Sequence, residues 1–161
     1  MSRRRIRQRL SPLLLLITVA LAMAGCNRKA IYSHFENLSV DGWDQRDTLF
    51  FVVSPIPEDG TYTEEVGLRI NDSYPFTALT LIVEQEVFPS GQTRIDTLNG
   101  RFVTQDGKRL GSGINLFQYD FPLCSIPLQQ SDSLRITLYH HMKRQLLPGI
   151  SDIGVTMRRE E

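Results

Sequence analysis

Histidines and paired glutamates are the residues of this sequence that are candidates for metal binding or catalysis. In "HHMK" (140–143), His140 and His141 would point to opposite faces of a strand, so they cannot chelate one metal ion together. Glu84 and Glu86 would share a strand face about 6.8 Å apart, a separation that could serve glycoside hydrolysis. Two acids on a solvated strand face are far commoner. We therefore predict no catalytic residues, no metal site and no cofactor, and we interpret His140 as a buried, hydrogen-bonded imidazole.

Cysteine offers a different chemistry, because Cys26 follows a segment typical of a secretory signal peptide. Five arginines precede position 10, and an uncharged apolar run follows to Ala24, too short to span a bilayer. The order Ala24-Gly25-Cys26 is similar to the bacterial lipobox, in which cleavage between Gly25 and Cys26 exposes a lipidated cysteine. We predict a lipoprotein signal peptide over 1–25, lipidation of Cys26 and a lipidated tether over 26–33. An ordinary signal peptide with an incidental cysteine is the alternative.

The predicted anchor indicates a location in the cell envelope. Two or three acyl chains, such as palmitate, attach a protein to lipid effectively permanently, since each buried CH₂ contributes about 0.8 kcal/mol. No acidic run follows Cys26 closely, and some lipoproteins use such a run as a surface-export tag. We therefore expect the protein on the outer membrane, facing the periplasm.

Composition limits the partners and the covalent chemistry of the mature chain. From Cys26 onward there are 136 residues, with 13 basic and 18 acidic side chains, hence a net charge of −5. This size suits one domain, and the dispersed negative charge argues against nucleic acid. If Cys26 is acylated, Cys124 has no disulfide partner. Its apolar neighbours in "FPLCSIPL" predict a buried small hydrophobic residue.

Apolar and polar residues alternate with period two through most of the mature chain, which predicts strands. No window shows a helical period with caps, although "NLFQYDF" (115–121) could form a short helix. Glycine, proline and aspartate turns separate the strands. We predict an all-β fold, a single antiparallel β-sandwich over 34–161 that is Ig-like or jelly-roll-like. The expected strands cover 48–54, 64–72, 78–88, 93–103, 133–143 and 149–159.

Aromatic residues could line a carbohydrate-binding or protein-binding surface, or fill the core. Trp43 in "VDGWDQRD" is flanked by acids. It could pack over one end of the sandwich or serve as an exposed anchor, so we predict it as a candidate interaction residue. The other aromatic residues of interest are Phe50, Tyr62, Phe76 and Tyr119.

Four stretches occur in an order that resembles the GldH family of gliding-motility lipoproteins from Bacteroidota. They are "LSVDGWDQRDTLFF", "LIVEQEVFPSGQTRIDTL", "QDGKRLGSG" and "HHMKRQLLPGISDIGVTM". Lys143 and His141 depart from the residues common in that family. The matching positions are Gly42-Trp43, Phe88-Pro89, Asp96-Thr97-Leu98, His140, Met142, Gly149-Ile150, Asp152 and Gly154.

The resemblance implies a lipoprotein needed for gliding and linked to the secretion and motility machinery of these bacteria. It implies no known catalytic activity and no known ligand. We therefore expect a non-catalytic accessory component that contacts membrane lipid through its acylated cysteine and contacts other envelope motility and secretion proteins. The alternative is a ligand-binding envelope lipoprotein for a glycan or another nutrient.

Overall fold

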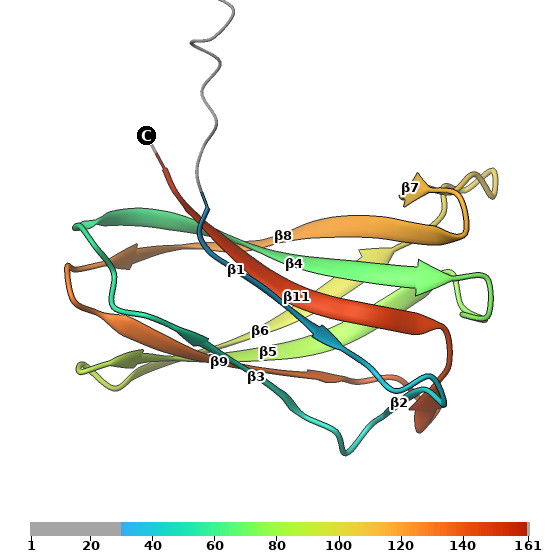
Figure 1. Ribbon diagram of the computed structural model, residues 1–161, viewed down its shortest axis with the longest axis horizontal. Helices are drawn as coiled ribbons and strands as arrows, with labels where there is room; N and C mark the ends of the chain where they lie inside the picture. Colours follow the sequence, from blue (N-terminus) through green and yellow to red (C-terminus); the bar gives the residue numbers. More distant parts are fainter. Residues whose placement is uncertain (1–29, 161) are drawn as a thin grey trace, which may run out of the picture.

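Two antiparallel sheets face each other in the computed structural model, which describes residues 30–160 (Figure 1). A short pair of strands lies at one end. The predicted β-sandwich is confirmed. The five-stranded sheet has the order β1 (Ala30–Asn37), β11 (Ile150–Arg159), β4 (Gly60–Asn71), β8 (Leu116–Leu128) and β7 (Ser112–Gly113). The four-stranded sheet has the order β3 (Leu49–Val53), β9 (Ser133–His140), β5 (Ala78–Phe88) and β6 (Gln92–Arg101), and the short pair is β10 (Leu146–Leu147) with β2 (Trp43–Asp44).

Residues 30–160 contain no helix that is long and apolar enough to cross a membrane. The signal peptide over 1–25, the Gly25–Cys26 cleavage site and lipidation of Cys26 lie outside the described residues. They stay predictions.

The core lies between the two sheets, where the predicted alternation places it. Val66 and Leu68 of β4, Leu81 of β5 and Ile136 of β9 are fully buried on the inner faces. Residues between them in each strand face outward because successive side chains point to opposite sides of a sheet.

Strand β8 differs from the short helix considered for 115–121. It is a 13-residue strand paired with β4 over its whole length, and it contains both Pro122 and Pro127. Proline cannot donate to the ladder, so it is tolerated at bulges and on free strand edges. Pro122 lies at the register shift between Glu64 and Glu65. Beta7 pairs with β8 only at residues 117 and 118, so the prolines lie where that edge is free.

Strand β1 begins at Ala30, so positions 30–33 of the expected tether belong to the sheet. Ala30 lies opposite Arg158 of β11. Ile31 and Tyr32 pack against the core while staying partly exposed. A half-buried edge strand has little apolar periodicity, so the sequence alone does not indicate where this strand begins.

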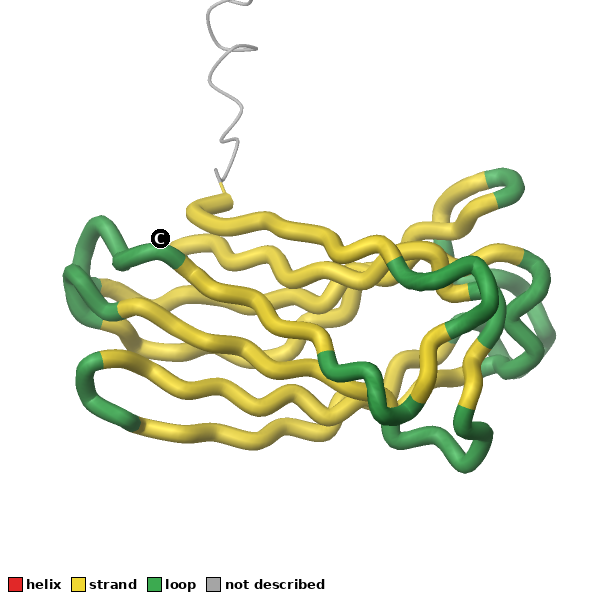
Figure 2. Tube along the Cα trace, turned by 60° about the horizontal axis from the view of Figure 1, so that its bottom comes forward, coloured by secondary structure: helices red, strands yellow, loops and turns green. Residues whose placement is uncertain are grey.

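The turns gather at the two ends of the sandwich (Figure 2). At one end, here called the Ala30 end, lie the connections 54–59, 89–91 and 129–132, near the start of β1. At the opposite end, the far end, lie 38–42, 72–77, 102–111 and 141–149 together with β2 and β10 (Figure 1). Beta1 runs from the first end toward the second.

The ring of Phe35, from edge strand β1, lies over two glycines on the outer face of the five-stranded sheet. A Cβ added to Gly154 would stand 2.5 Å from the backbone oxygen of His34 and 2.5 Å from Cγ of Phe35. Gly67 lies under the same ring, and the guanidinium of Arg69 stacks on it 4.9 Å from the centroid.

Gly154→Ala should therefore lower the free energy of unfolding by about 1–3 kcal/mol, because the added methyl meets backbone that cannot move away. Urea denaturation followed by tryptophan fluorescence measures this. Gly60→Ala is the matched control, since its Cβ would approach only the flexible side chain of Arg159. Equal effects of the two substitutions would contradict the steric account.

Candidate functional site

The paired glutamates lie on the open outer face of the four-stranded sheet. Glu84 Oε1 accepts a hydrogen bond from the hydroxyl of Tyr139 at 2.9 Å. Glu86 forms an ion pair with Arg135 at 3.6 Å. Each carboxylate therefore has its own partner on a neighbouring strand, which is an arrangement typical of a solvated sheet face.

Trp43 is buried, so of the two expected alternatives it packs over one end of the sandwich and is not an exposed anchor. Its exposed fraction is 1%. The indole N–H donates to the carbonyl oxygen of Asp47 at 2.8 Å, and the ring meets His140 edge-on with centroids 5.1 Å apart. Trp43 therefore closes the far end of the core.

His140 is the buried, hydrogen-bonded imidazole that the sequence predicts. It is fully buried, and its Nε2–H donates to the carbonyl oxygen of Trp43 at 3.2 Å. Burial lowers the pKa of His140 below its usual value. His141 is exposed on the other face of the chain. Within residues 30–160, no group of three His, Cys, Asp or Glu side chains could hold a metal ion.

A polar trio lies inside the core, and its two most buried members were not anticipated. Glu64 of β4 and Gln85 of β5 are 1% and 2% exposed. Gln85 Nε2 donates to Glu64 Oε2 at 2.5 Å, and the thiol of Cys124 donates to the same oxygen at 3.3 Å. Glu64 and Gln85 occupy inward positions of the alternating strands, and that position was the signal in the sequence.

Burial controls the protonation of this trio. It raises the pKa of Glu64 to about 7 and the pKa of the Cys124 thiol to about 12. Among the described residues, Glu64 Oε1 and Gln85 Oε1 have no hydrogen-bond partner. Both atoms are acceptors unless Glu64 is protonated, when its carboxyl group becomes a donor. The arrangement therefore favours the neutral acid.

Cys124 is less buried than predicted. It is only partly buried, and it donates to a carboxyl oxygen instead of packing as a hydrophobic residue. Arg94 and Asp96 form an ion pair at 2.6 Å near the edge of the trio. The thiol stays protonated because its pKa is raised, so it is a poor nucleophile.

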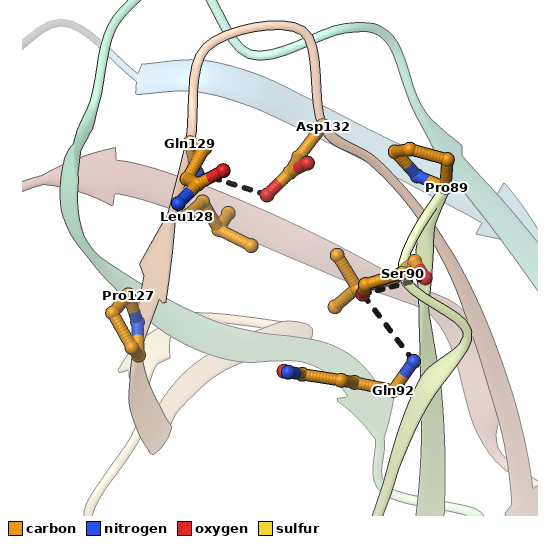
Figure 3. A pocket seen from close by; sticks show the side chains of 8 residues that line it. Pro89, Ser90, Gln92, Pro127, Leu128, Gln129 and Asp132 are labelled. Atoms are coloured by element: carbon orange, nitrogen blue, oxygen red, sulfur yellow. Dashed lines mark hydrogen bonds between the residues drawn. The ribbon is translucent and has the colours of Figure 1, made fainter.

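A hollow at the Ala30 end lies between the β5–β6 and β8–β9 turns (Figure 3). Its volume is about 440 Å³. Its polar groups bond one another: Gln129 N–H donates to Asp132 at 2.9 Å, and Gln92 N–H donates to the Ser90 hydroxyl at 3.4 Å. These bonds shape the turns, and no cationic side chain lines the hollow. Its lining residues are Val87, Pro89, Ser90, Gln92, Pro127, Leu128, Gln129 and Asp132.

Several exposed apolar side chains lie instead on the connections and strand ends of the far end. Val40 is 99% exposed and Ile114 is 88% exposed. Large exposed apolar side chains at one end of a domain are candidates for an interaction surface. A second, smaller set lies on the outer face of the four-stranded sheet and consists of Phe50, Val52 and Ile95. The far-end apolar group consists of Val40, Phe76, Leu110, Ile114, Leu116 and Leu146.

Residues 30–157 match the family described as GldH lipoprotein. The chain belongs to this family. The resemblance drawn from the four ordered stretches is thereby confirmed, and with it the assignment to lipoproteins of gliding motility.

Two relatives align over almost their whole length. The gliding motility lipoprotein GldH of Flavobacterium johnsoniae is 24% identical over 158 residues, which cover 91% of this chain and 96% of the relative. The GldH homolog of Christiangramia forsetii is 23% identical over 165 residues, which cover 97% and 99%.

Solved structures are similar only at a coarse level. A family 35 carbohydrate-binding module from Clostridium thermocellum has a TM-score of 0.36 at 13% identity, covering 77% of this chain and 87% of the module. A likeness at this score supports no function.

The single tryptophan of the chain should be shielded from solvent in the native protein. Iodide should quench its fluorescence weakly before unfolding and strongly in concentrated guanidinium, because the indole lies between the core and the short strand pair. Stern–Volmer constants measure both states. Equal quenching in the two states would contradict the packing of Trp43 against His140.

Stability should fall as the pH rises from about 5 to 8, because the pKa of Glu64 is higher in the folded than in the unfolded chain. Below its unfolded value, near 4.5, Glu64 is protonated in both states and its contribution is fully present. That contribution is lost as the pH passes about 7, and the loss is on the order of 3 kcal/mol.

Urea titrations across this pH range measure the effect. Glu64→Gln should flatten the profile, since a neutral amide does not ionise. Glu86→Gln is the matched control on an exposed face and should leave the slope unchanged. A Glu64→Gln profile that still follows the wild-type slope would contradict the assignment.

Proposed function

We propose that this protein is a lipid-anchored, non-catalytic accessory component of the gliding motility and associated secretion machinery. It is held by lipidated Cys26 on the outer membrane, faces the periplasm, and contacts other envelope proteins through its far end. The proposal depends on one observation, the far-end apolar group, in a member of a gliding motility lipoprotein family. Exposed apolar side chains on several loops suit a protein partner.

The position of Ala30 supports this orientation. Only three residues, Asn27 to Lys29, separate the predicted anchor Cys26 from β1, and the span from Cys26 to Ala30 is at most about 14 Å. Beta1 then extends about 26 Å toward the far end. The Ala30 end would therefore lie near the membrane while the far-end loops reach away from it.

The alternative of a glycan-binding lipoprotein loses its main support. Such a site needs exposed aromatic rings that gather in a groove. Of the five aromatic residues considered from the sequence, Trp43, Tyr62 and Tyr119 are buried. Phe50 and Phe76, which are exposed, lie on different elements, β3 and the 72–77 connection.

The test is replacement of the gene in the bacterium that encodes it. Deletion should reduce colony spreading and the amount of secreted protein in the culture supernatant. Cys26→Ser should fail to restore either one, because the chain would be unprocessed or mislocalised. Normal cleavage and membrane retention of Cys26→Ser would contradict the anchor.

Val40→Asp combined with Ile114→Asp tests the far end. Both side chains are almost fully exposed, so the protein should keep wild-type abundance while spreading and secretion fall. Val52→Asp combined with Ile95→Asp, each 68% exposed on the sheet face, is the matched control and should restore both. Full activity of the far-end variant would contradict the proposal.

A further inference from the structure

A cleft at the far end combines an apolar floor with cationic side chains. It lies between the 72–77 connection and the segment that follows β9, and its volume is about 580 Å³. We call it the 141–144 cleft. Its lining residues are Phe76, Thr80, His141, Met142, Lys143 and Arg144.

Backbone contacts fix the shape of this cleft. His141 N–H donates to the carbonyl oxygen of Thr80 at 2.8 Å, which ties the segment after β9 to β5. The sulfur of Met142 accepts from Thr80 N–H at 3.4 Å, and Met142 also packs against the core. Phe76 is held edge-on against Tyr74, with centroids 5.7 Å apart. The floor is therefore apolar, partly exposed and positioned before any ligand arrives.

The cations of this cleft are free to pair with a ligand. No ion pair formed within residues 30–160 uses Lys143 or Arg144, and both are exposed. Two other basic residues at this end are paired, Arg46 with Asp44 and Arg109 with Asp72, whereas Lys108 is exposed and lies outside the cleft. The mature chain is acidic overall, so positive charge at this one cleft is a local feature that would attract an anion.

We propose that the 141–144 cleft binds an acidic segment of a partner protein that carries a large apolar side chain beside its carboxylates. The apolar side chain packs on Met142 and Phe76, and the carboxylates pair with Lys143 and Arg144. Methionine adapts to varied apolar partners, and both methionine and arginine are enriched at protein interfaces. A protein fits better than a lipid headgroup because the cleft shares Phe76 with the far-end apolar group, whose other members lie at the same end of the sandwich. This inference rests on the proposed function, whose partner-facing surface it specifies.

A peptide selection tests the chemistry of the cleft directly. The probe is a phage library of random heptapeptides, selected against the purified full lipoprotein in phosphatidylcholine nanodiscs. Selected peptides should be enriched in aspartate or glutamate next to a large apolar residue. The affinity of a selected peptide, measured by fluorescence polarisation, should fall about tenfold in Lys143→Glu and in Arg144→Glu.

Lys108→Glu is the matched control, since it makes the same charge change on an exposed far-end loop outside the cleft. It should change the affinity less than about twofold. Selected peptides without acidic bias, or equal losses in Lys108→Glu and Lys143→Glu, would overturn the inference. Binding to phosphatidylglycerol vesicles that depends on Lys143, with no peptide selected, would assign the cleft to lipid and would also overturn it.

The failure of this inference is distinguishable from failure of the proposed function. If Val40→Asp with Ile114→Asp abolishes spreading while Lys143→Glu and Arg144→Glu spread normally and the wild-type protein selects no acidic peptide, the far end contacts its partner without the cleft. If all of these variants spread normally, the proposed function fails as well.

Discussion

The burial of two sheet faces against each other is the constraint on which the rest of this structure depends. The central side chains of β4, β5, β9 and β11 are completely enclosed, and each contributes about 1.5–3 kcal/mol. Because of this burial, inward apolar residues alternate with outward residues along β4, β5, β9 and β11. These strands run along the length of the sandwich. Connections are then possible only at the two ends.

Three of the buried polar side chains, Glu64, Gln85 and His140, differ in how well their hydrogen bonds are satisfied. His140 has a carbonyl partner from Trp43, so a neutral imidazole fits without cost and helps to close the far end. Glu64 and Gln85 leave one acceptor each without a donor. An unsatisfied buried polar atom costs about 1–3 kcal/mol. The trio therefore opposes stability, most strongly when Glu64 is ionised, and the surrounding apolar packing must offset that cost.

Period-two alternation made the long strands predictable from the sequence, because each buries one face and leaves the other in water. Beta4, β5, β9 and β11 follow it closely. This alternation does not predict strands that are buried on both faces or only partly buried. Beta1 is a half-buried edge, and β8 carries two prolines that a free edge and a bulge accommodate. Trp43 was ambiguous because its neighbours in sequence are acids, whereas its neighbours in space are His140 and the carbonyl of Asp47. The polar trio joins β4, β5 and β8, and pairing of this kind between sheets has no local signal.

The two ends of the sandwich differ in a way that packing alone does not require. At the Ala30 end, the turn residues around the hollow direct their hydrogen bonds at one another, so they are already satisfied without a ligand. At the far end, Lys143 and Arg144 form no ion pair with the described residues. The apolar side chains of Val40 and Ile114 are exposed to water there. Folding of the domain does not require such groups at this end. A partner that brings carboxylates and apolar side chains would give these groups the contacts they lack, and the short tether would hold the far end at a defined reach from the membrane.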